Sequence, residues 1–204
     1  MNAAQTRPQT LSQRFGRSPA VLDWRQAALL LIDHQCEYAD GGLPLAGMRE
    51  AVAECAALLR LARSKGAPVF HVQHLAPAGA PLFDAAGAWV RFIEGIGPEG
   101  GEAVVTKSLP NAFAGTTLQA GLAAAGRRQL VIAGFMTHMC VSTTTRAAAE
   151  QGYTNWVVAD ACATRDLPLP WGEVVPAMAV QRAALAALND SFATVVKQHG
   201  VLTG

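Results

Sequence analysis

Three side chains capable of covalent chemistry each follow a short apolar segment of the sequence. Asp33 comes directly after the apolar run 27–32, Lys107 closes the run 103–107, and Cys140 stands a few residues after a third run. In a parallel α/β sheet, ligands bind outside the carboxyl ends of the strands. If the three runs are parallel strands, the acid, the amine and the thiol share one edge of the sheet. The spacing therefore predicts a catalytic site built from these three residues.

This set of side chains suits nucleophilic catalysis by a thiolate. A free cysteine has a pKa of about 8.5, which a helix N-terminus and a nearby cation both lower. We expect Cys140 to gain the first from a helix that it opens and the second from Lys107. Asp33 would accept the thiol proton and later return it to a leaving amine. Backbone N–H groups of the segment 134–140 would form an oxyanion hole.

The elements that must position these residues alternate along the chain. Apolar runs predict strands at 27–33, 68–73, 103–107, 129–134, 155–160 and 193–197, and helical spacing predicts helices at 48–64, 116–125, 137–151 and 173–188. A first strand that is apolar throughout is typical of burial on both faces. Alternating strands and helices predict right-handed crossovers. The expected fold is α/β, a three-layer α/β/α sandwich with a six-stranded, mostly parallel sheet of Rossmann-like topology.

The chain of 204 residues is expected to form one domain preceded by an arm. Hydrophobic residues make up 51% and charged residues 15%, which favours a sizeable core over disorder. We place the domain at 23–204 and the arm at 1–22. With three arginines and no acid, the composition of the arm resembles a transit peptide, but Pro8 and Pro19 interrupt any amphipathic helix. We expect it to be flexible or to dock on a neighbouring subunit.

The net charge and the length of the apolar runs limit the classes of partner, and the spacing of the cysteines indicates the compartment. The formal net charge is +1 without a basic block, which argues against a nucleic-acid partner. The run 27–32 is far short of a bilayer span, which argues against a membrane partner. Four widely spaced cysteines favour reduced thiols and a cytoplasmic location. The expected partner is a small-molecule substrate.

Common nucleotide, hydrolase and metal motifs are missing from the sequence. The first strand is not followed by G-x-G-x-x-G, and there is no P-loop, no G-x-S-x-G and no H-E-x-x-H. His71 and His74 form a close pair, but positions three apart on a strand point to opposite faces. The sequence therefore predicts neither a shared metal nor a cofactor.

Four motifs together resemble the isochorismatase-like cysteine hydrolase superfamily, which includes nicotinamidases, N-carbamoylsarcosine amidases and ureidoacrylate-type amidohydrolases. The motifs are L-L-L-I-D-H-Q at Asp33, V-V-T-K at Lys107, G-F-M-T-H-M-C-V at Cys140, and V-V-A-D-A-C-A-T after it. The resemblance covers roughly 25–197. It implies an Asp33-Lys107-Cys140 triad, a cis peptide between Phe135 and Met136, and an oxyanion hole from the backbone N–H groups of Met136 and Cys140. It also implies a homo-oligomer, a dimer or a tetramer, whose subunits help to wall the site.

The points where the resemblance stops narrow the expected chemistry. The metal-binding nicotinamidases carry Asp-x-His and a further His after the second strand, whereas this chain has H-V-Q-H-L. Isochorismatases that cleave a vinyl ether need the acid but can replace the cysteine, so Cys140 favours covalent attack on a carbonyl. The leading hypothesis is a cysteine hydrolase that cleaves a C–N bond of a small amide, carbamoyl or lactam-like substrate through a thioester. The alternatives are vinyl-ether hydrolysis and a redox-sensing thiol on the same fold.

Four further residues are candidates for contact with a substrate: Gln35, Trp89, Phe113 and His138. Gln35 follows Asp33 and can orient it, touch a substrate, or be a solvated loop amide. Trp89, in the irregular stretch 76–101, and Phe113 can wall a flat substrate or simply pack. His138 is expected in the pocket, with a Cys–His dyad as the rival assignment. The stretch 76–101 itself is of the kind that often forms a site wall or lid.

Overall fold

A six-stranded parallel sheet forms the centre of the protein. The computed structural model describes residues 7–203. The strand order is β3-β2-β1-β4-β5-β8, and each neighbouring pair is parallel. The strands are β1 (Ala27–Ile32), β2 (Val69–His74), β3 (Ala103–Lys107), β4 (Gln129–Phe135), β5 (Thr154–Ala163) and β8 (Thr194–Val196). The predicted fold class and the Rossmann-like strand order are therefore confirmed.

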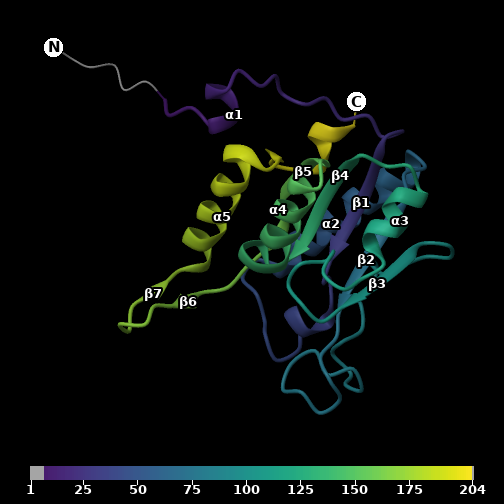
Figure 1. The fold of residues 1–204 in the computed structure, drawn as a ribbon. Coiled ribbons are helices and arrows are strands. Elements are labelled where there is room, and N and C mark those ends of the chain that lie inside the picture. Colours follow the sequence, from purple (N-terminus) through teal and green to yellow (C-terminus); the bar gives the residue numbers. More distant parts are fainter. Residues whose placement is uncertain (1–6, 204) are drawn as a thin grey trace.

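Helices cover both faces of this sheet, which gives the expected three layers (Figure 1). The helices are α2 (Met48–Ser64), α3 (Leu118–Ala124), α4 (Ser142–Glu150) and α5 (Ala177–Ser191), with short turns η1 (Cys36–Tyr38) and η3 (His199–Leu202). Leu29 and Leu31 of β1 pack with α2, whereas Leu30 and Ile32 pack with α3, α4 and α5. β1 is completely buried because it meets a hydrophobic layer on each side. Within residues 7–203, no helix is long and apolar enough to cross a membrane.

The predicted helix at 173–188 is wrong in its first residues. A two-residue strand β7 (Val174–Val175) pairs antiparallel with β6 (Leu167–Pro168), and α5 begins only after Pro176. The residue before a proline is restricted to extended conformations, and adjacent valines favour a strand. The hairpin of β6 and β7 projects away from the sheet in Figure 1.

The irregular stretch 76–101 docks on the segment that follows Asp33. Cys36 N–H donates to Arg91 C=O at 2.9 Å, and Ile93 N–H donates to His34 C=O at 3.0 Å. These backbone bonds hold the stretch beside the carboxyl end of β1. The stretch thus lies where a wall of the candidate site is expected.

The described part of the arm contacts the domain of the same chain. Residues 1–6 of the predicted arm lie outside the described residues. The short helix α1 (Leu11–Arg14) begins with a hydrogen-bonded cap at Thr10, and Leu11 N–H donates to Asp190 Oδ1 on α5 at 2.9 Å. This short helix therefore has a partner on α5.

Candidate active site

The structure brings Asp33, Lys107 and Cys140 together. Lys107 Nζ lies 2.7 Å from Asp33 Oδ2 and 3.4 Å from Cys140 Sγ. The side chains of Asp33 and Lys107 are fully buried, and Cys140 is 5% exposed. At the sheet edge anticipated from the sequence, an acid, an amine and a thiol are thus in contact away from bulk water.

The strand order explains why a lysine serves at this position. β2 separates β3 from β1, so Lys107 must reach across one strand to meet Asp33. Neighbouring strands lie about 4.8 Å apart, and the four-carbon stem of lysine is long enough to cross β2. Cys140 approaches from the other side, because β4 is the opposite neighbour of β1.

The backbone of Asp33 has an unusual conformation. Its φ angle is 50°, in the left-handed region that few non-glycine residues adopt. Its N–H still donates to Val72 C=O at 2.9 Å, and its C=O accepts from Gln35 N–H at 2.8 Å. The strand therefore ends at the residue before Asp33, where the carboxylate meets Lys107.

Cys140 lies in a π-helical turn and not in the regular helix expected there. The turn spans Thr137–Val141, and α4 begins at Ser142. Thr137 Oγ1 donates to Ala163 C=O at 3.0 Å, which fastens the turn to the end of β5. Single π turns are frequent at functional sites. The spacing of apolar residues does not distinguish such a turn from an α-helix, so the sequence could not reveal it.

The residues before this turn allow β1 and β4 to approach closely. The Phe135–Met136 peptide bond is cis, and Gly134 has a φ of 120°. A Cβ atom on Gly134 would lie 2.0 Å from the backbone oxygen of Ile32. Only glycine fits at such a position. The oxyanion hole assigned to the N–H groups of Met136 and Cys140 stays a prediction.

Burial controls the charge states of the acid and the thiol. Burial raises the pKa of Asp33 above its usual value, although the Lys107 charge opposes the shift. Burial and the Asp33 carboxylate together raise the pKa of Cys140 to about 12, again against Lys107. The lowered thiol pKa expected from the sequence is therefore wrong, because desolvation outweighs the nearby amine. The resting thiol therefore keeps its proton at neutral pH, and the Asp33 carboxyl group contacts the same ammonium group.

Gln35 fastens the 76–101 stretch to β2 and does not offer its amide to a substrate. Its Nε2 donates to the C=O groups of His74 at 3.0 Å and Val90 at 2.7 Å, and its Oε1 accepts from His74 N–H at 2.8 Å. The residue is fully buried. The substrate contact expected of Gln35 is corrected accordingly, since both polar atoms of the amide already bind the backbone of β2 and of the 76–101 stretch.

The other three residues predicted to contact a substrate have different surroundings. Phe113 stacks on Tyr153 with ring centroids 5.9 Å apart and packs against the core on the α3 side, so its role is packing. His138 Nδ1 lies 2.6 Å from Thr164 Oγ1, a contact that ties the Cys140 turn to residues after β5. Trp89 is 43% exposed in the 76–101 stretch, and its substrate contact stays a prediction.

His74 belongs to this cluster, although the sequence did not reveal it. It is the last residue of β2 and is in register with Lys107 on β3. Its Nδ1 lies 3.1 Å from Lys107 Nζ. Burial and the Lys107 charge lower the pKa of His74 to about 4, so the ring is neutral at neutral pH. Its place at the end of the strand between β1 and β3 was the signal that could have found it.

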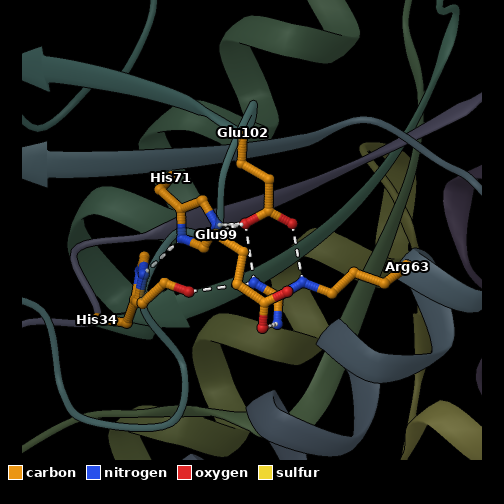
Figure 2. Close-up of polar contacts among 6 residues, drawn as sticks. His34, Arg63, His71, Glu99 and Glu102 are labelled. Carbon is orange, nitrogen blue, oxygen red and sulfur yellow. Dashed lines mark hydrogen bonds and ion pairs between the residues drawn. The ribbon is translucent and has the colours of Figure 1, made fainter.

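A second polar cluster begins at the buried His34, the residue after the candidate base, and reaches the surface at Glu99. Figure 2 shows His34, His71, Glu102, Arg63 and Glu99 joined by polar contacts. His34 Nε2 lies 2.9 Å from His71 Nδ1, and His71 Nε2 lies 2.8 Å from Glu102 Oε2. Arg63 pairs with Glu102 at 2.8 Å and with Glu99 at 2.7 Å. Although burial opposes it, the hydrogen bond from Arg63 helps to lower the pKa of Glu102 to about 2.

The charge on Glu102 sets the direction of the hydrogen bonds in this second cluster. An ionised carboxylate only accepts, so His71 donates from Nε2 and accepts from His34 at Nδ1. Burial lowers the pKa of both histidines, in keeping with neutral rings. His71 and His74 thus serve different clusters. In the described part of the chain, no group of three or more His, Cys, Asp or Glu side chains could hold a metal ion.

Comparisons with known proteins identify the family of this chain. The family model for the isochorismatase domain matches residues 27–199. A secreted isochorismatase effector of Verticillium dahliae is 37% identical over 187 residues, which cover 92% of this chain and 96% of that protein. The maleamate amidohydrolase of Pseudomonas putida is 32% identical over 190 residues, which cover 79% of this chain and 84% of that protein.

A solved structure agrees as well. The crystal structure of an isochorismatase from Pseudomonas putida KT2440 superimposes with a TM-score of 0.88 at 43% identity, covering 93% of this chain and 97% of that one. The two folds therefore agree over most of both chains. With the family model, the relatives and the fold in agreement, this chain belongs to the isochorismatase family of hydrolases.

Proposed function

We propose that the protein is a cysteine amidohydrolase that cleaves a C–N bond of a small amide, carbamoyl or lactam-like substrate through a thioester. The observation that carries the proposal is the double contact of Lys107, at 2.7 Å from the Asp33 carboxylate and 3.4 Å from the Cys140 thiol. One ammonium group thereby holds a base next to a nucleophile. The similarity to a maleamate amidohydrolase supports the choice of a C–N bond.

The first half of the reaction forms the thioester. Cys140 Sγ attacks the carbonyl carbon while its proton passes to Asp33. The raised pKa of Asp33 suits a carboxyl group that must take a proton and give it back. Lys107 offsets the negative charge that moves from Asp33 to the reacting atoms, and the N–H groups of Met136 and Cys140 would bind the oxyanion. The C–N bond then breaks as Asp33 protonates the leaving nitrogen.

The second half restores the enzyme. A water molecule attacks the thioester carbonyl and gives one proton to Asp33. The C–S bond breaks, the sulfur takes that proton from Asp33, and an acid is released. The balance is one water consumed for one C–N bond cleaved, with the nitrogen leaving as an amine or as ammonia.

The test is to trap the acyl group on the proposed nucleophile. The protein would be incubated with small primary amides, carbamoyl compounds and lactams, with amine or ammonia release measured and acid-quenched samples weighed by intact mass spectrometry. We expect Cys140→Ala to lose both release and adduct. Cys36→Ala is the matched control, because Cys36 is also buried but its Sγ contacts Phe92 C=O at 3.6 Å. This control should keep both signals.

Two outcomes would overturn the proposal, and each would favour one of the alternative functions. Turnover that survives in Cys140→Ala would favour vinyl-ether hydrolysis, which needs an acid and no thiol. Oxidation or alkylation at Cys140 without hydrolysis of any compound in the panel would favour a redox-sensing thiol.

A further inference from the structure

The Lys107 ammonium has a third partner besides the acid and the thiol. An ammonium carries three N–H donors and no acceptor. The contacts of Nζ are Asp33 Oδ2 at 2.7 Å, His74 Nδ1 at 3.1 Å and Cys140 Sγ at 3.4 Å. The number of nearby acceptor atoms therefore equals the number of donors. His74 supplies the acceptor that neither base nor nucleophile provides.

We propose that His74 is a positioning residue of the catalytic centre, whose Nδ1 takes one N–H of Lys107 and so fixes how the other two are shared between Asp33 and Cys140. This inference rests on the proposed function for its meaning. Because Lys107 only donates, Nδ1 must be the bare nitrogen of a neutral ring, and the ring proton is on Nε2. The low pKa of His74, about 4, agrees with that state.

Three contacts keep the His74 ring in place. Gln35 binds the backbone of His74 twice, accepting from its N–H at 2.8 Å and donating to its C=O at 3.0 Å. The edge of the ring packs on Phe83, with centroids 4.9 Å apart and planes at 71°. The β2–β3 register sets His74 opposite Lys107. Gln35, two residues after Asp33, thus links the backbone of the base to the residue that orients Lys107.

This arrangement matters most when Asp33 takes the thiol proton. The carboxyl group then loses its charge, and its ion pair with Lys107 disappears. The contact with His74 does not depend on the charge of Asp33, so it persists through this step. The ammonium is thereby kept beside the sulfur while the sulfur carries negative charge.

The experiment compares side chains that keep or remove the acceptor at the position of Nδ1. The Oδ1 atom of asparagine is the same number of bonds from Cα as Nδ1 of histidine, whereas Oε1 of glutamine is one bond further. The variants are His74→Asn, His74→Gln and His74→Leu. The measurement is the rate of Cys140 alkylation by iodoacetamide against pH, read by peptide mass spectrometry. This readout needs no substrate, so it distinguishes a failure of this inference from a failure of the amidohydrolase proposal.

We expect His74→Leu to slow alkylation of Cys140 by about tenfold and to move its pH profile upward, because a hydrogen bond to a charged group is lost. His74→Asn should stay close to the wild-type profile, and His74→Gln should resemble His74→Leu. The control is His199→Asn, which changes a histidine that pairs with Glu54 on α2 and should leave the profile unchanged.

Two results would overturn the inference: wild-type alkylation in all three variants, or equal losses in His74→Asn and His74→Leu. If His74→Leu does not fold, as judged by circular dichroism, the contrast between His74→Asn and His74→Gln decides the matter alone.

Discussion

Asp33 and His34 are adjacent in the chain, yet they begin two polar clusters that differ in how completely their members are hydrogen-bonded. In the His34 cluster, hydrogen bonds and ion pairs lead through Glu102 to the partly exposed Arg63. In the Asp33 cluster, neither carboxylate oxygen has a hydrogen bond of regular geometry among the described residues, although Lys107 Nζ is 2.7 Å from Oδ2. Hydrogen bonds stabilise a buried polar cluster, and each buried polar atom without one costs stability. Within residues 7–203, one such atom remains in the His34 cluster, His34 Nδ1, whereas both carboxylate oxygens of Asp33 lack a regular hydrogen bond. We infer from this comparison that the His34 cluster mainly stabilises the fold, whereas the Asp33 cluster is available for catalysis.

The largest expected effect comes from a substitution in the Asp33 cluster. Asp33→Asn removes the proton acceptor while keeping the shape of the side chain, so turnover should fall on the order of 10³-fold to 10⁴-fold. The measurement is kcat on a substrate found in the amide panel, with circular dichroism to confirm folding. Activity within about tenfold of wild type would remove Asp33 from the role of base.

A substitution in the His34 cluster should affect the free energy of unfolding more than the rate of hydrolysis. Glu102→Gln removes the charge that binds Arg63 and His71, so the free energy of unfolding should fall by about 2 kcal/mol. The rate of hydrolysis should change by less than about tenfold, since no contact of the Asp33 cluster is removed. Urea unfolding and kcat would be measured together. Glu50→Gln is the control, because its pair with Arg49 is largely exposed and should contribute little.

Glu102 and Asp33 should contribute to the pH dependence of stability with opposite signs. The pKa of Glu102 is lowered to about 2 in the folded state, so its contribution is present above its usual pKa of about 4.5 and disappears as the pH falls toward 2. The pKa of Asp33 is raised, so its contribution is present below its usual pKa and is lost as the pH rises.

This sign can be checked by unfolding the wild type and Glu102→Gln in urea between neutral pH and the lowest pH at which both fold. The difference in free energy should shrink as the pH falls below about 4.5. A difference that stays constant over this range would contradict the pairing of Glu102 with Arg63 and His71.

The smallest effect should come from the histidine nearest to the nucleophile in the sequence. His138→Asn keeps a polar atom near the position of Nδ1, which contacts Thr164 at 2.6 Å, and should lower kcat by less than about tenfold. A loss comparable to that of Asp33→Asn would revive the Cys–His dyad.

The sequence predicted the members of the Asp33 cluster better than their environment. Asp33, Lys107 and Cys140 could be placed because the carboxyl ends of parallel strands share one edge, a rule that needs only strand positions. The shifted pKa of Cys140 could not be predicted, because desolvation depends on what surrounds the sulfur. His74 and the His34 cluster were missed because side-chain directions at strand ends depend on loops such as 76–101. The helix at 48–64, with its regular apolar spacing, was predicted to the residue.

The closeness of β1 and β4 at Gly134 has a consequence for changing the substrate range. Any methyl group there would meet the backbone of Ile32 at 2.0 Å, which no rotamer can relieve. Mutant libraries aimed at new substrates should therefore leave this glycine untouched and draw their diversity from the 76–101 stretch, where exposed positions such as Trp89 leave room for new side chains.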